Sequence, residues 1–199
     1  MRRLLCIVCS MVFLLTGCSN SRQIESAAII ENVTVDRQDG RLVYTFYRLT
    51  SGDEPWGIAV SARSFEEACR LASEEYIPNL SLSKLELLLI SEDAADAVMT
   101  TDLPYISTQP FFSPVAYLTL CDDRTIEAFR KTNRTQRLIE QQLILLKYHN
   151  PSVSIDYLSV FNHLAADRAE GFLVPFVYSD KELKIAEYRL RAKKMTENH

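Results

Sequence analysis

The sequence predicts an α+β domain in which a mixed β-sheet, opened by an N-terminal hairpin, packs against several helices. Two β-rich runs flank the Asp39-Gly40 turn, which is the usual signature of a hairpin. Further along, short apolar runs alternate with amphipathic helical stretches, as in strands that are buried within a sheet. The apolar fraction of 47% is ordinary for a globular chain. We therefore expect a single α+β domain over residues 27–192.

The first residues have a different character and predict an exported, lipid-anchored protein. Met1-Arg2-Arg3 is a short positive start, and Leu4 to Leu15 is almost entirely apolar. This run is shorter than the roughly 20 residues needed to span a bilayer, and the order of its parts is that of a secretory signal. It ends in Leu15-Thr16-Gly17-Cys18, the Leu-small-small-Cys pattern that the bacterial lipoprotein machinery recognises.

We interpret residues 1–17 as a lipoprotein signal peptide, Cys18 as the lipidation site and residues 18–26 as a polar tether. Two or three acyl chains, such as palmitate, hold a protein firmly where one is marginal, since each buried CH₂ contributes about 0.8 kcal/mol. The alternatives are a plain secretory signal with a chance cysteine, or a buried N-terminal helix. Lipidation predicts a protein held on the outer side of a membrane.

Charge and hydropathy exclude some classes of protein. Removal of residues 1–17 leaves 182 residues and moves the net charge from −4 to −6, because Arg2 and Arg3 are lost. A mildly acidic chain without a basic stripe is not expected to bind nucleic acid. After Cys18 the longest apolar run, Leu87 to Ile90, is far too short for a transmembrane helix.

The first half of the predicted domain combines the hairpin with one helix between strands. Ser64 and Glu67 form a capping box, and Pro78 follows the helix that this box starts. Five side chains at helical spacing are expected to face the core, namely Phe65, Ala68, Cys69, Ala72 and Tyr76. The expected elements are strands at 27–36, 41–49 and 56–61, a helix at 64–76 and a central buried strand at 82–90.

The second half is expected to contain four helices and at least two strands. Asp122 or Asp123 is expected to cap a helix, and Asn150-Pro151 to end the longest one. We expect a helix at 92–99, a proline-punctuated loop at 104–114, a strand at 115–121, helices at 125–131, 134–148 and 154–166, and a strand at 172–178. The longest of these helices carries Leu138, Leu143, Leu145 and Leu146, and the next is expected to carry Ile155, Leu158, Phe161 and Ala165 on one face. Residues 181–194 fit a helix or the second arm of a hairpin, and we favour the hairpin.

The sequence predicts no catalytic residue, cofactor or metal site, and hence no enzyme. His149 is expected at a helix end, His163 lies on a helix beside Phe161, and His199 is the last residue. With five glycines, the chain shows neither a phosphate-binding glycine loop nor a nucleophile elbow. The pair Asp122-Asp123 resembles catalytic carboxylates, but its place before a helix favours capping.

Three further groups of residues keep two interpretations open. A basic cluster can face anionic lipid or be a solvated helix face, and consists of Arg124, Arg130, Lys131, Arg134 and Arg137. An aromatic group can form a contact surface or pack inward, and consists of Tyr105, Phe111, Phe112 and Tyr117. Cys69 and Cys121 can form one disulfide, although two lone cysteines are more often small buried hydrophobes.

Several short segments resemble the Ger(x)C family, the C-subunit (GerAC-type) lipoproteins of spore germinant receptors. The resemblance begins in Gly17-Cys18-Ser19-Asn20-Ser21-Arg22-Gln23-Ile24-Glu25, where Ser19 stands in place of the family's Trp. It continues in Ala62-Arg63-Ser64-Phe65-Glu66-Glu67-Ala68, then Leu89-Ile90-Ser91-Glu92-Asp93, and later Ile155-Asp156-Tyr157-Leu158 and Val174-Pro175. Family members continue with further domains, so we expect this chain to correspond to their N-terminal domain.

The resemblance implies a membrane-anchored, non-enzymatic component in spore germination. Its implied partners are the membrane and multi-pass germinant-receptor subunits, and its implied location is the outer side of the spore inner membrane or the cell membrane. The alternative is an independent cell-envelope lipoprotein that binds a small ligand or another exported protein.

Overall fold

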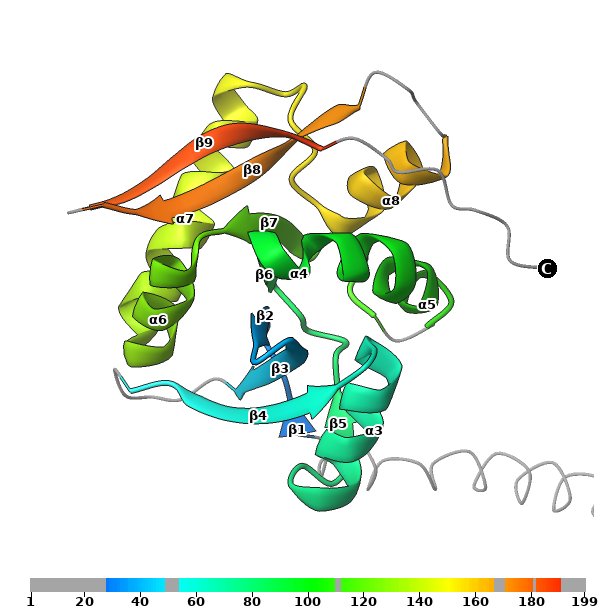
Figure 1. Ribbon diagram of the computed structural model, residues 1–199. Coiled ribbons are helices and arrows are strands. Elements are labelled where there is room, and N and C mark those ends of the chain that lie inside the picture. The colour runs from blue at the N-terminus through cyan, green and yellow to red at the C-terminus, as the bar shows by residue number, and fades with distance from the viewer. Residues whose placement is uncertain (1–27, 49–53, 110–111, 167–170, 181, 191–199) are drawn as a thin grey trace, which may run out of the picture.

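A seven-stranded mixed sheet forms the centre of the protein in a computed structural model, which describes residues 28–48, 54–109, 112–166, 171–180 and 182–190. The order of the strands is β4-β3-β2-β6-β7-β8-β9, and β1 pairs separately with β5. Figure 1 shows the sheet edge-on, from β4 at the bottom to β9 at the top. The strands are β1 Ala28–Ile29, β2 Asn32–Gln38, β3 Arg41–Arg48, β4 Trp56–Ala62, β5 Leu80–Ser81, β6 Leu87–Ser91, β7 Tyr117–Cys121, β8 Phe172–Ser179 and β9 Leu183–Leu190.

Helices cover both faces of this sheet (Figure 1). The helices are α3 Phe65–Glu75, α4 Glu92–Ala97, the π-helical turn η1 Val98–Asp102, α5 Leu103–Ser107, α6 Asp123–Lys131, α7 Asn133–His149 and α8 Tyr157–Ala165. The larger core lies between the sheet and α3, α4, α5 and α8. The smaller core lies between the opposite face and α6 and α7. The predicted α+β class with a mixed sheet and an N-terminal hairpin is confirmed.

The hairpin and the parallel centre of the sheet follow from the sequence pattern. In β2, Val33 and Val35 face the larger core, and the turn between β2 and β3 places Asp39 and Gly40 at φ 49° and 78°. These positive angles are those of the two-residue turn that Asp-Gly favours. β6 lies between β2 and β7 and runs parallel to both, and all of its residues are buried. The sequence therefore predicted the central position of this strand correctly.

The residues between β6 and β7 differ from the predicted proline-rich loop. After α4 the chain continues through η1 and α5, so that helical structure extends to Ser107. Pro104 is the second residue of α5, which follows η1 without a break, so this proline lies within a helical segment and not in a loop.

The segment before α8 also differs from prediction. The helix begins at Tyr157, and Asp156 caps it by accepting a 2.8 Å hydrogen bond from the amide of Ser159. Ser154 and Ile155 instead lie between β7 and β8, because the amide of Leu118 donates to Ile155 and that of Ser154 donates to Leu173. Within the helix, Tyr157 and Val160 are buried, whereas Leu158 and Ala165, which were expected on one apolar face, are exposed.

One more expected core residue needs correction, and one ambiguous segment is settled. In α7 the buried side chains are Thr135, Ile139 and Leu143, while Leu138 and Leu145 are exposed. Tyr76, which follows α3 and was expected to face the core, is 53% exposed, and the strand expected at 82–90 begins only at Leu87. The tail forms β9, antiparallel to β8, so the preferred hairpin is confirmed.

Candidate functional site

One edge of the sheet collects the ends of its parallel strands. β2, β6, β7 and β8 run in the same direction, and α4 and α6 begin directly after β6 and β7. β4 also ends here, because Ala62 pairs with Leu42 beside the β2–β3 turn, and α3 follows it. In sheets with helices on both faces, ligands bind preferentially at this edge. Polar groups that converge at this edge are therefore candidates for a binding site.

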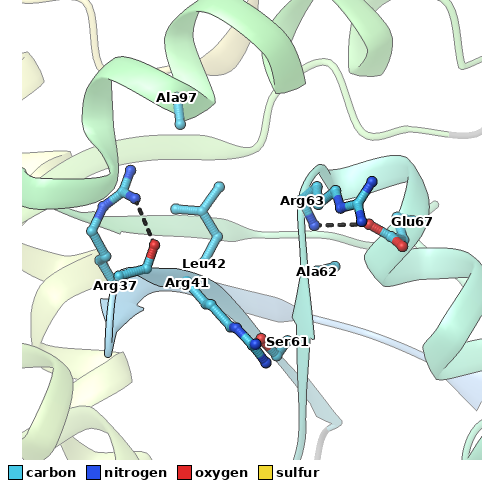
Figure 2. A pocket seen from close by; sticks show the side chains of 9 residues that line it. Arg37, Arg41, Leu42, Ser61, Ala62, Arg63, Glu67 and Ala97 are labelled. Carbon is cyan, nitrogen blue, oxygen red and sulfur yellow. Dashed lines mark hydrogen bonds between the residues drawn. The ribbon is translucent and has the colours of Figure 1, made fainter.

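An open pocket of about 580 Å³ lies at this edge, and three arginines line it. Figure 2 shows Arg37 directed toward Ala97 of α4, Arg41 directed toward Ser61, and Arg63 beside Glu67 at the start of α3. All three arginines are exposed. In the described part of the chain, no ion pair joins any of their guanidinium groups to a carboxylate. The pocket is thus a positively charged hollow in a chain whose net charge is −4.

Backbone contacts hold two of these arginines in place. The Arg37 guanidinium donates to the carbonyl oxygens of Asp93, at 3.2 Å, and Gly40, at 3.1 Å. The amide of Arg63 donates a 2.8 Å hydrogen bond to Glu67, so the predicted capping box closes on Arg63, while Ser64 accepts from the amide of Glu67. Guanidinium groups recognise carboxylate and phosphate oxygens through paired hydrogen bonds. The arrangement can therefore bind an anion.

A smaller pocket of about 260 Å³ lies beside α3 and has a mostly apolar lining. Its lining residues are Phe65, Cys69, Leu80, Ser81, Leu82, Tyr105, Gln109 and Phe112. Burial, with a smaller contribution from Asp102, raises the pKa of the Cys69 thiol to about 12. A thiol with so high a pKa is almost entirely protonated at neutral pH, which does not suit a nucleophile.

The one fully buried acidic side chain in the described residues is Asp102, in η1. Its carboxylate accepts 2.8 Å hydrogen bonds from the Tyr44 hydroxyl and from the amide of Phe65. Burial raises its pKa, and these two hydrogen bonds oppose the rise. Asp102 thereby ties β3, η1 and the first turn of α3 together, which is a structural role.

The sheet face beneath α6 is unusually polar. Asn32, Thr34 and Thr45 are buried there. Arg130 reaches this layer from α6 and places one guanidinium nitrogen 3.0 Å from both carboxylate oxygens of Asp36. Gln38 also donates to Asp36 at 2.8 Å. Arg130 was predicted to belong to a basic surface cluster, but its side chain instead forms an ion pair with the buried Asp36.

Three glutamates lie close together where the parallel strands begin. Burial and then the charge of Glu86 raise the pKa of Glu31. Glu140 of α7 faces the same pair, and its pKa is raised to about 7, mainly by burial and further by Glu86 and Glu31. A hydrogen bond from Gln136 and the charge of Arg137 oppose that rise. Three carboxylates without a described ligand do not by themselves define a site.

The histidines and paired aspartates are accounted for by structure. His149 is the last residue of α7, and His163 stacks on Phe172 with ring centroids 5.0 Å apart. Asp122 caps α6 by accepting a 2.9 Å hydrogen bond from the amide of Thr125, which confirms the capping interpretation. His199 lies outside the described residues, and so does the predicted lipidation site Cys18.

The aromatic and cysteine alternatives are partly decided. Phe112 is buried and contacts the rings of Phe65 and Tyr157, so it packs inward, while Phe111 lies outside the described residues.

Cys69 and Cys121 are both free, because they belong to cores on opposite faces of the sheet. The predicted disulfide alternative is therefore wrong.

The described residues contain no group of three or more His, Cys, Asp or Glu side chains that could hold a metal ion. None of the helices in this part of the chain has both the length and the apolar character needed to cross a membrane.

Sequence reasoning did not find the arginine pocket or the Tyr44–Asp102 contact. Arg37 and Arg41 flank the predicted turn, which hints at clustered charge, but no local pattern connects them with Arg63. Asp102 lies in a stretch that reads as a loop, so no signal marked it as buried.

Comparison with known proteins identifies the family. Over residues 20–177 the chain matches the family described as the spore germination protein N-terminal domain, of the GerAC type. No curated protein and no solved structure matches it. The matched region runs from the residues that follow Cys18 into β8. Because this match covers most of the chain, the protein belongs to the GerAC-type family of spore germination proteins.

Proposed function

We propose that this protein is a lipid-anchored, non-enzymatic component of a germinant-receptor complex, acting in assembly or signal transmission during spore germination. The observation that carries the proposal is the family match over residues 20–177, which begins two residues after Cys18. The lipoprotein signal pattern and the germination domain are therefore adjacent in one chain. The proposed location is the outer side of the spore inner membrane or the cell membrane.

The lipid anchor is supported by the sequence of residues 1–18. A positive start, an apolar run and Leu15-Thr16-Gly17-Cys18 occur in the order that lipoprotein processing requires. Diacylglyceryl transfer to the Cys18 sulfur and cleavage before Cys18 would give a mature chain held by its first residue. Two or more acyl chains make such attachment effectively stable.

A role in binding rather than catalysis is supported by what the reactive side chains do. The Asp102 carboxylate accepts two core hydrogen bonds, and the pKa of the Cys69 thiol is raised to about 12 by burial. His163 is stacked on Phe172. Each of these groups has a structural role, which leaves surfaces as the means of action. The proposed partners are the multi-pass membrane subunits of the receptor.

The test is co-purification from membranes of sporulating cells. A C-terminally tagged chain would be solubilised in mild detergent, and the proteins that come with it would be identified and quantified. We expect multi-pass receptor subunits in fixed proportion, and we expect Cys18→Ala to lose both its lipid mass and this recovery. Recovery of the lipidated chain alone would contradict the receptor role. A Cys18→Ala chain that keeps its lipid mass would contradict the anchor.

The arginine pocket favours a second candidate function, an independent envelope lipoprotein that binds a small anionic ligand. Arg37, Arg41 and Arg63 line this pocket without an ion-pair partner among the described carboxylates. A ligand that binds only the folded state raises its melting temperature. A saturable thermal shift with inorganic phosphate or a dicarboxylate, lost in Arg37→Gln and Arg63→Gln, would favour this candidate. No shift with either anion would oppose it.

A further inference from the structure

Helix α7 presents apolar side chains to solvent as well as to the core. Its inward side is formed by Thr135, Ile139 and Leu143. Leu138, Ile144, Leu145 and Tyr148 have exposed fractions of 39%, 54%, 51% and 83%. These are four of the nine large hydrophobic side chains that are exposed among the described residues. Such a concentration on one helix marks an interaction surface, whereas scattered single side chains would not.

The exposed side of α7 is also free of acidic residues. Arg134, Gln141, Leu145 and Tyr148 recur at spacings of seven, four and three residues, which places them on one face of the helix. The only carboxylate in α7 belongs to Glu140, which is partly buried and directed toward Glu31 and Glu86. We define the α7 outer face as Arg134, Leu138, Gln141, Ile144, Leu145 and Tyr148.

An exposed cation extends this surface at its N-terminal end. Lys131, the last residue of α6, is exposed and lies two residues before α7. The cations at one end, the apolar side chains at the other and the absence of acid on the outer face contrast with the chain's net charge of −4. A basic helix with an exposed apolar face is typical of helices that lie in a membrane interface.

The anchor position brings this face within reach of a membrane. Nine residues lie between Cys18 and Ala28, where β1 begins, and the ten residue-to-residue steps span at most about 35 Å when fully extended. α7 has 17 residues and is therefore about 25 Å long. Glu31 follows Ala28 by three residues and is near enough to Glu140, in the middle of α7, for their charges to interact. Ala28 itself pairs with Leu80 of β5 and belongs to the larger core, so the chain enters the domain on the α3 side of the sheet, close to the end of the sheet where Glu31 and Glu140 lie.

We propose that the α7 outer face docks on the anionic phospholipid surface to which Cys18 tethers the chain. The inference rests on the lipid anchor of the proposed function. Arg134 and its neighbours contact lipid phosphates, while Ile144, Leu145 and Tyr148 enter the headgroup and acyl boundary. A short tether raises the effective concentration of the membrane near the domain, so even a low affinity of the α7 outer face for lipid is sufficient for docking. Docking would hold the sheet in one orientation above the bilayer.

The test uses the mature, lipidated full chain in vesicles. An environment-sensitive fluorophore is attached at Tyr148→Cys, and in a matched chain at Glu66→Cys, an exposed position of α3 on the opposite side of the sheet. The vesicles are phosphatidylcholine with or without phosphatidylglycerol, and a quencher is carried on the acyl chains. We expect several-fold stronger quenching at position 148 than at 66 on anionic vesicles, and a smaller difference on phosphatidylcholine alone.

Two substitutions separate charge from apolar contact. Arg134→Gln is expected to reduce the docked-to-undocked ratio roughly fivefold on anionic vesicles, because each basic residue near such a surface contributes about that factor. Leu145→Asn should also reduce quenching at position 148, whereas Gln142→Asn, exposed but outside the outer face, should leave it unchanged. If either variant fails to fold by circular dichroism, the comparison of positions 148 and 66 in the otherwise unchanged chain still decides.

The experiment distinguishes failure of the proposed docking from failure of the proposed lipid anchor. Equal quenching at positions 148 and 66, in chains that float with anionic vesicles, would overturn the docking and leave the anchor intact. A chain that does not float with vesicles would contradict the anchor and the docking together. Protection of position 148 that depends on protein concentration and not on lipid would overturn the proposal, because a second protein would then cover this face.

Discussion

The hydroxyl of Tyr44 donates a 2.8 Å hydrogen bond to the Asp102 carboxylate across 58 residues of sequence. The other carboxylate oxygen accepts from the amide of Phe65, also at 2.8 Å. One buried side chain thus satisfies two buried donors from different elements. The contact joins the N-terminal hairpin to the helical segment that follows β6.

Loss of this carboxylate should destabilise the fold more than loss of the hydroxyl. Asp102→Ala leaves the Tyr44 hydroxyl and the Phe65 amide buried without a partner, so we expect a loss of about 3 kcal/mol. Tyr44→Phe removes one donor and should cost about 1 kcal/mol. Urea unfolding would measure both, and the double variant should lose less than the sum. Equal, small losses for the two single variants would contradict the assigned role.

Loss of Arg130, which forms the ion pair with Asp36, should destabilise the fold more than loss of the other arginine of α6, Arg124. Asp36 is 6% exposed, so Arg130→Met would leave a buried carboxylate without its cation. We expect a loss of about 2–3 kcal/mol in the free energy of unfolding, somewhat below that of a fully buried pair because Arg130 is partly solvated. The matched control is Arg124→Met, at an exposed position of the same helix, which should change stability by less than about 0.5 kcal/mol. Similar effects of the two substitutions would show that the ion pair is dispensable.

Glu140 should make stability depend on pH in a defined direction. Its pKa in the folded state is about 7, mainly because of burial, whereas an unfolded glutamate has a pKa near 4.5. The folded state therefore holds the proton more tightly, and the stability that this confers is present below pH 4.5 and lost as the pH rises through 7. Because Glu140 is partly solvated, we expect a loss of only about 1–2 kcal/mol across this window.

Glu140→Gln tests that dependence. Glutamine cannot ionise, so the variant should gain about 1–2 kcal/mol relative to the parent at pH 8 and show a flatter stability profile between pH 5 and 8. Urea unfolding at several pH values is the measurement. Glu127→Gln, at an exposed position of α6, is the control and should keep the parent profile. A parent-like profile in Glu140→Gln would assign the pH dependence to other groups.

The two described cysteines should react only when the protein unfolds. Burial raises the pKa of Cys69 to about 12 and raises the pKa of Cys121 as well. Maleimide labelling should therefore be slow in buffer and complete in urea, without a reducing agent. Peptide mass spectrometry locates the labelled thiols. A peptide that links Cys69 to Cys121 would contradict the separation of these residues by the sheet.

Local patterns in the sequence determined most of the elements. The Asp39-Gly40 turn implies the β2–β3 hairpin because its two residues readily adopt positive φ angles. Ser64 and Asp122 cap α3 and α6 as expected, since a cap needs only a side-chain oxygen and an amide two or three residues later. The germination-family assignment was also reached from short segments and is confirmed by the match over residues 20–177.

The side of a helix that faces the core was not determined by pattern alone. α7 has apolar residues around much of its circumference, so its leucines did not indicate which side of the helix would be buried. The sheet buries Ile139 and Leu143. Pro104 was ambiguous for a similar reason, since proline is compatible with both a loop and a first helical turn.

Only the tertiary structure decided which distant side chains meet. Parallel pairing of β2 with β6 and the return of α6 over the sheet bring Asp36 to Arg130, and the packing of η1 on β3 brings Asp102 to Tyr44. The same folding gathers Arg37, Arg41 and Arg63 around one pocket and leaves the α7 outer face in solvent. Hairpins and caps are settled by interactions within a few residues, so sequence reveals them. Contacts across 50 to 100 residues depend on strand order and helix rotation, which no short segment encodes.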